Sequence, residues 1–88
     1  MIDIDVKVEI SGNVSEYQLY IKNVFVSNAY LTVENYLNYD DMDNVIKTLI
    51  TNNIDYFRKL TVDEFLSVRN FFYGYQNLDI AKFVFEDL

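Results

Sequence analysis

The hydrophobic pattern of this chain changes its period part-way along, and that change limits the folds available to it. Apolar and polar residues alternate from Ile2 to Ile10, which is the period of a strand with one buried face. From about residue 41 the apolar positions recur three and four residues apart, as on one face of an amphipathic helix. Strands followed by helices predict an α+β fold.

Turn-forming residues divide the strand half. Ser11-Gly12-Asn13 predicts a hairpin turn, and Ser27-Asn28 predicts a second one. The apolar run Val24-Phe25-Val26 breaks the alternation, which indicates a bulge or a strand end buried on both faces. We therefore expect an antiparallel β-hairpin or three-stranded meander, with strands over about 2–10, 15–26 and 29–35. The stretch 32–35 also suits the start of a short helix, so both interpretations of 29–37 stay open.

The second half predicts three helices packed on one face of the sheet, over about 42–52, 62–73 and 78–87. Asp41 is the expected N-cap of the first, with Asp43 in its first turn, where the helix dipole favours negative charge. Thr61 and Glu64 have the spacing of a capping box at the start of the second helix. Gly74 is expected to end that helix.

The composition excludes several classes of chemistry. At 88 residues the chain is expected to form a single compact domain, 1–88, with one modest core. It has no cysteine and no histidine, and so lacks thiolate nucleophiles, cysteine zinc ligands and the usual general base near neutral pH. Its two glycines cannot make a glycine-rich phosphate loop. We expect no enzymatic activity, no catalytic or metal-binding residues and no cofactor.

The acidic stretch 38–45, NYDDMDNV, has residue types that also occur in calcium loops. An EF-hand loop needs oxygen ligands at positions 1, 3 and 5, Gly at position 6 and Glu at position 12. A loop that starts at Asp41 has Val45 at position 5, Ile46 at position 6 and Asn52 at position 12. The stretch is therefore better interpreted as a helix start, which leaves Asp40 without a local structural role.

The charge balance indicates the kind of partner. Fourteen acidic residues against seven basic ones give a net charge of −7. Direct binding to nucleic acid or to an anionic membrane is disfavoured, because affinity for phosphates comes from Lys and Arg. A basic protein is the natural electrostatic match. No apolar run reaches the length of a membrane span, so we expect a cytoplasmic protein, in the host cytoplasm if the chain is phage-encoded.

Acidic residues without a local structural role, together with surplus tyrosines, predict the partner-binding surface. Carboxylates two residues apart on a strand lie roughly 6.5–7 Å apart, which is of the order of the spacing between neighbouring phosphates. Tyr is amphipathic and enriched at protein interfaces. The expected partner-binding residues are Asp3, Asp5, Glu9, Tyr20, Glu34, Tyr36, Tyr39 and Asp40.

Two functions fit these observations. The first is a small acidic protein-binding domain that inhibits a basic, nucleic-acid-handling host protein by imitating phosphates. In general character the chain is similar to the anti-CRISPR and anti-restriction proteins of bacteriophages, which are short, acidic and poor in cysteine, although no motif links it to one of their families. The alternative is a structural or adaptor module that self-associates as a homo-oligomer through exposed tyrosines.

Overall fold

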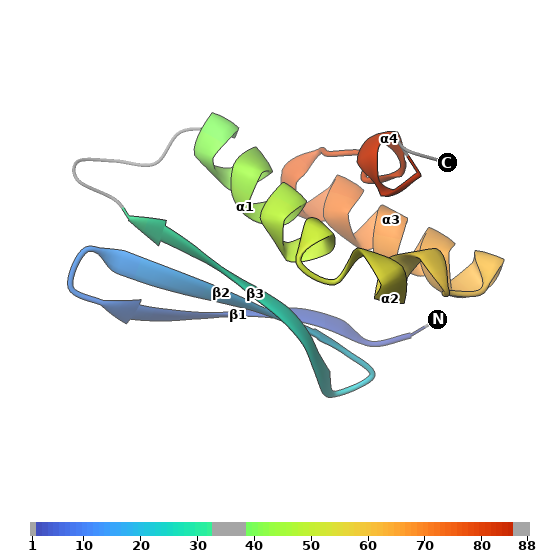
Figure 1. Ribbon diagram of the computed structural model, residues 1–88, viewed down its shortest axis with the longest axis horizontal. Helices are drawn as coiled ribbons and strands as arrows, with labels where there is room; N and C mark the ends of the chain where they lie inside the picture. Colours follow the sequence, from blue (N-terminus) through green and yellow to red (C-terminus); the bar gives the residue numbers. More distant parts are fainter. Residues whose placement is uncertain (1, 33–38, 86–88) are drawn as a thin grey trace.

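The computed structural model describes residues 2–32 and 39–85, and it has the expected α+β architecture. Three antiparallel strands in the order β1-β2-β3 form a meander, and the helices lie against one face of it (Figure 1). The strands are β1 (Ile4–Ser11), β2 (Val14–Ile21) and β3 (Val24–Thr32). The helices are α1 (Tyr39–Thr51), α2 (Ile54–Arg58), α3 (Val62–Gln76) and α4 (Ala81–Val84).

The two hairpin turns differ in how well the sequence predicts them. The first is at Gly12, whose φ of 62° is in the left-handed region that glycine adopts readily. The second is at Lys22 and Asn23, with φ of 55° and 64°. The prediction of a turn at Ser27-Asn28 and of a strand continuing to residue 26 was therefore wrong. Two successive left-handed residues match the twist of a hairpin, but a Lys-Asn pair is a weak signal for them.

The break in the alternation of the sequence corresponds to a β-bulge. Leu19 faces Ser27 and Tyr20 faces Phe25, so Val26 is an extra residue in β3. Val26 and Ser27 are consequently both buried although they are neighbours in a strand. Of the two interpretations of the apolar run, the bulge is confirmed. A strand end buried on both faces is wrong, because Val24 and Phe25 are 63% and 51% exposed.

Helix α1 begins earlier than predicted. It starts at Tyr39, which places Asp41 inside the first turn, so the assignment of Asp41 as N-cap was wrong. Negative charge is favourable throughout the first turn of a helix, and a run of aspartates therefore does not mark the cap itself. The predicted end at about residue 52 is confirmed, because the helix ends at Thr51.

Helix α3 has the predicted start but a different end. Thr61 Oγ1 accepts a hydrogen bond from the Glu64 backbone N–H, and the Glu64 carboxylate accepts one from the Thr61 N–H, which completes the capping box. The helix continues through Gly74 and ends at the left-handed Asn77, so the prediction for Gly74 was wrong. Tyr75 stacks on Phe71 with ring centroids 5.8 Å apart, which holds the last turn in place beyond the glycine.

The last helix is shorter in the described residues than the predicted range 78–87. Helix α4 begins at Ala81, and the Asp79 carboxylate accepts a hydrogen bond from the Ala81 N–H. Arg69 of α3 donates two hydrogen bonds to the same carboxylate, each 2.8 Å long. Hydrogen bonds from Arg69 lower the pKa of Asp79 to about 2. This carboxylate therefore joins α3 to the start of α4.

The core lies between the helices and one face of the sheet. Helix α1 packs mainly on β3 and β2, as Figure 1 shows. The fully buried core residues include Leu19, Ile21, Ile46, Leu49, Ile50, Phe57, Val68, Phe72, Ile80 and Val84. The distal part of β1 lies beyond this cover: Val8 is 44% exposed and Ile10 is 74% exposed, although the alternation predicted both on the buried face.

Polar side chains fix the end of α1 to β3. The Ser27 hydroxyl donates a hydrogen bond of 2.6 Å to the Leu49 carbonyl. The side-chain amides of Asn52 and Asn53 donate to the carbonyls of Asn28 and Val26, at 2.9 and 3.0 Å. In the part of the chain that is described, no helix has the length and apolar character needed to cross a bilayer.

Candidate functional site

The sheet face that points away from the helices is the candidate site, and we call it the outer face. Antiparallel pairing brings polar and aromatic side chains of three strands together on it, because residues opposite each other in a ladder share a face. Its residues are Asp3, Asp5, Lys7 and Glu9 before and along β1, Glu16, Gln18 and Tyr20 on β2, and Phe25, Asn28 and Tyr30 on β3. None of the described helices covers this face in Figure 1.

At one end of the outer face, the ammonium group of a lysine lies over one of two neighbouring aromatic rings. The Lys7 ammonium lies 4.4 Å from the centroid of the Tyr20 ring, in a cation–π arrangement. Tyr20 meets Phe25 edge to face, with centroids 5.8 Å apart. Asp3 and Asp5 border a shallow hollow of about 160 Å³ beside these rings. The hollow is smaller than the roughly 300–1,000 Å³ of ordinary small-molecule sites, so this surface suits a macromolecule better.

At the other end of the outer face, two negatively charged carboxylates lie opposite each other. Glu9 on β1 and Glu16 on β2 are directly opposite in the register. The Asn28 side-chain amide donates a hydrogen bond of 2.9 Å to Glu16 and also one of 3.4 Å to the Tyr30 hydroxyl. The hydrogen bond from Asn28 is the main reason that the pKa of Glu16 lies below its ordinary value. Glu16 therefore stays charged, although like charges directly opposite repel.

The outer face is strongly negative as a whole. Among the described residues it holds the four carboxylates of Asp3, Asp5, Glu9 and Glu16 against one ammonium, that of Lys7. The next base along the chain, Lys22 in the turn after β2, does not add to it.

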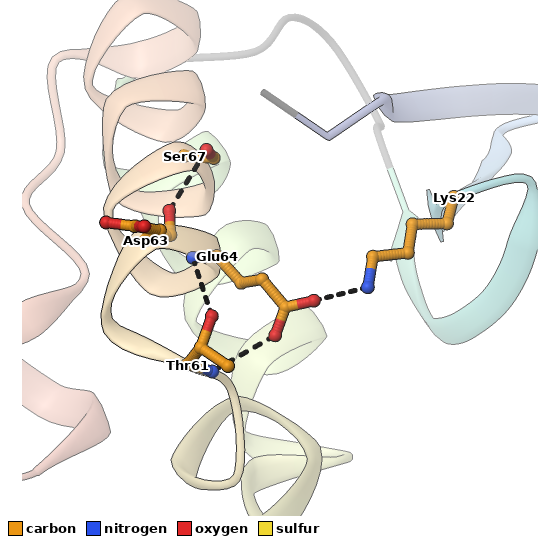
Figure 2. A network of polar contacts seen from close by, with 5 residues as sticks. All are labelled: Lys22, Thr61, Asp63, Glu64 and Ser67. Carbon is orange, nitrogen blue, oxygen red and sulfur yellow. Dashed lines mark hydrogen bonds and ion pairs between the residues drawn. The ribbon is translucent and has the colours of Figure 1, made fainter.

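Lys22 is instead engaged with α3. Figure 2 shows its ammonium directed at the Glu64 carboxylate, which also accepts the capping-box hydrogen bond from Thr61. Hydrogen bonding to Lys22, followed by that to Thr61, lowers the pKa of Glu64 to about 2. The same contact raises the pKa of Lys22. The positive charge of Lys22 is thus neutralised by the helical layer.

The structure brings together half of the predicted partner-binding residues. Asp3, Asp5, Glu9 and Tyr20 all lie on the outer face. Glu34 and Tyr36 lie outside the described residues, as do the side chains of the other two predicted residues, Tyr39 and Asp40, whose backbones begin α1.

Six of the ten residues on this surface were not among the predicted partner-binding residues: Lys7, Glu16, Gln18, Phe25, Asn28 and Tyr30. Glu16 and Tyr30 are on the polar side of their strands, but nothing in the sequence showed that Glu16 lies beside Glu9 and Tyr30 beside Glu16. Phe25 is 51% exposed and was hidden in an apolar run whose phase the bulge shifts. Only the strand pairing places these side chains next to the predicted ones.

A second hollow, of about 420 Å³, lies between the start of β1 and α3. It is lined by the apolar residues Ile2, Ile4 and Phe71, the polar residues Ser67 and Asn70, and one charged residue, Asp3. It lacks the convergent charged groups that would orient a ligand. Among the described residues no group of three or more Asp or Glu is placed to hold a metal ion.

Comparison with known protein families, with curated proteins and with solved structures found no match. The function is therefore inferred from the chemistry of the outer face.

Proposed function

We propose that this chain is a small acidic, non-enzymatic protein-binding domain whose outer face contacts a basic partner protein. The observation that supports it is the composition of that face: four carboxylates and one ammonium on a sheet face that none of the described helices covers. Such a surface attracts a basic partner and accelerates their encounter. Tyr20, Phe25 and Tyr30 would supply the apolar contact that a purely ionic surface lacks.

We further propose that the partner handles nucleic acid and that the chain inhibits it by imitating phosphates. Asp3 and Asp5 have the i, i+2 spacing of a strand, roughly 6.5–7 Å, similar to that of successive phosphates. Glu9 and Glu16 add a second pair of negative charges across two strands. A site built for the phosphates of a nucleic acid would therefore meet a similar arrangement of charge here.

The electrostatic part of the proposal is tested with a fluorescent Lys/Arg-rich peptide as the probe. Fluorescence anisotropy would measure its affinity for the wild type and for the double variant Asp5→Asn/Glu9→Gln. The matched control, Asp43→Asn/Asp55→Asn, changes the net charge equally but on the helical side. We expect the outer-face variant to lose more affinity than the control, and high salt to weaken wild-type binding. Equal losses in both variants would show that only net charge matters.

The nucleic-acid part needs a separate experiment. The immobilised wild type and both variants would be incubated with nuclease-treated bacterial extract, and the captured proteins identified by mass spectrometry. We expect the wild type to capture nucleic-acid-binding proteins. Added duplex DNA should displace these proteins, and the outer-face variant should fail to retain them. Captured proteins that are indifferent to both DNA and salt would refute phosphate mimicry while leaving protein binding in place.

A further inference from the structure

Strand β1 is an edge of the sheet, and one row of its backbone groups points away from β2. The Lys22 N–H donates a hydrogen bond of 2.8 Å to the Asp3 carbonyl, which fixes which residues face β2. Bonded and non-bonded pairs alternate along an antiparallel ladder, so the odd-numbered residues of β1 bond to β2. The N–H and C=O groups of Ile4, Val6, Val8 and Ile10 therefore point outward, where a further strand could pair with them.

Part of the opposite edge of the sheet already has hydrogen-bond partners. On β3, the carbonyls of Asn28 and Val26 accept hydrogen bonds from the side chains of Asn52 and Asn53 at the end of α1. Helix α1 also packs along β3, whereas no described helix packs along β1 to a comparable extent. Of the two edges, β1 is thus the more open to strand addition.

The distal half of β1 also exposes apolar surface. Val8 and Ile10 are on the side of the sheet that faces the helices, but they are 44% and 74% exposed, so the described helices leave them uncovered. A strand paired with β1 would place its own side chains beside these two residues, on the same face.

The charged residues of β1 on the outer face favour a second copy of the chain as the added strand, and they favour one register of pairing over the others. If two β1 strands pair antiparallel about a two-fold axis at Val8, Lys7 of each copy faces Glu9 of the other. Asp5 then faces the uncharged Ser11, Val8 faces Val8, and Ile10 faces Val6 of the second copy. This register forms about six main-chain hydrogen bonds, two for each of three outward-pointing pairs.

Neighbouring registers with the same hydrogen-bonding parity bring like charges together. An axis at Lys7 makes Lys7 face itself and Asp5 face Glu9, and an axis at Glu9 makes the two copies of that residue face each other. An axis at Val6 lets Asp5 face Lys7 but sets Asp3 against Glu9, so the attraction is offset by a repulsion. Like charges directly opposite are destabilising, so the axis at Val8 is favoured.

A second copy in this register would also relieve a repulsion within the monomer. Glu9 faces Glu16 on one side, and neither is opposite a basic residue in the register. In the dimer, Lys7 of the second copy would place a positive charge beside Glu9, on the side away from Glu16.

We propose that the protein forms a two-fold symmetric dimer through antiparallel pairing of its β1 strands, with Lys7 of each copy opposite Glu9 of the other. The dimer joins two three-stranded sheets and places both outer faces on the same side. The proposal does not depend on the identity of any partner, since a monomer has the same outer face.

Charge exchange at the interface provides the test. Sedimentation velocity over a range of concentrations should show reversible dimerisation of the wild type. Lys7→Glu or Glu9→Lys alone sets like charges opposite each other twice per dimer, so we expect the dissociation constant to rise on the order of tenfold or more. An equimolar mixture of the two variants, and the double variant Lys7→Glu/Glu9→Lys, should both dimerise again, because each pairs opposite charges.

Two further variants test whether the edge of β1 is the interface. Glu16→Lys makes the same charge change as Glu9→Lys one strand further away. It gives Glu9 a base within the monomer but sets no like charges opposite each other across the dimer, so it should weaken dimerisation far less than Glu9→Lys. Val8→Pro removes an outward N–H that β2 does not use, so it should abolish the dimer while the thermal melt still shows a folded monomer. A wild type that stays monomeric at every concentration, or variants that do not regain dimerisation on mixing, would overturn the proposal.

Discussion

The buried hydroxyl of Ser27 tests how the sheet and helix α1 are joined. Ser27 is only 4% exposed, and its hydroxyl donates to the Leu49 carbonyl over 2.6 Å. Leu49 is in the last turn of α1, whose carbonyls have no partner within the helix. The backbone N–H groups of Asn52 and Asn53 bond instead to Thr48 and Ile50. Ser27 is therefore the donor that satisfies the Leu49 carbonyl.

The change Ser27→Ala removes the hydroxyl donor and leaves the buried Leu49 carbonyl without a hydrogen bond. A buried polar group that loses its partner costs about 1–3 kcal/mol of stability. A loss of about 2 kcal/mol lowers the melting temperature by roughly 10 °C in a domain of this size. The variant Ser27→Cys keeps a similar volume with a weaker donor, so its loss should be smaller than that of Ser27→Ala.

The matched control is Ser67→Ala. The Ser67 hydroxyl donates to the Asp63 carbonyl, which lies within α3, where the helical ladder already provides an N–H donor (Figure 2). Ala is also the better helix former, so this change should be neutral or slightly stabilising. Urea denaturation of the wild type and the three variants gives the free energies of unfolding. If Ser27→Ala stays within about 0.5 kcal/mol of Ser67→Ala, the hydrogen bond to Leu49 does not hold the layers together.

Two other predictions concern acid stability and backbone conformation. Because the pKa values of Glu64 and Asp79 are lowered from 4.5 and 3.8 to about 2 in the folded protein, the stability they contribute is present above about pH 4.5 and is lost as the pH falls towards 2. Thermal melts of a Glu64→Gln/Asp79→Asn variant should therefore lose less stability over this range than those of the wild type, and parallel profiles would contradict the assignment. Gly74→Ala should raise the free energy of unfolding by up to about 1 kcal/mol, because Gly74 is inside a helix and, apart from the adjoining residues and backbone of that helix, no atom lies within 4 Å of the added methyl group. Gly12→Ala should lower it, because the φ of Gly12 is +62°, and equal effects of the two changes would refute this interpretation.

Much of the secondary structure could be predicted because its causes are local. Side chains alternate along a strand and recur every three to four residues on one face of a helix, so each pattern depends only on a single element. This holds for the alternation along β1 and for the helical spacing of Val45, Ile46, Leu49 and Ile50. The capping box at the start of α3 is equally local, since both of its hydrogen bonds join residues three positions apart.

The errors occurred where a local signal had more than one outcome. Glycine is tolerated in an exposed helix, and the stacking of Tyr75 on Phe71 continues α3 past Gly74. The second hairpin turn uses Lys22 and Asn23 in left-handed conformations, for which residues other than glycine give only a weak signal.

The candidate site divides in the same way. The sequence alone determined that Asp3, Asp5 and Glu9 share the polar side of one strand, because side chains alternate along it. Only the tertiary structure decided that Glu16 and Tyr30 join them, because strand register depends on turns, bulges and core packing. The tertiary structure likewise decided that Val8 and Ile10 stay exposed, because the reach of the helices over the sheet is a non-local property.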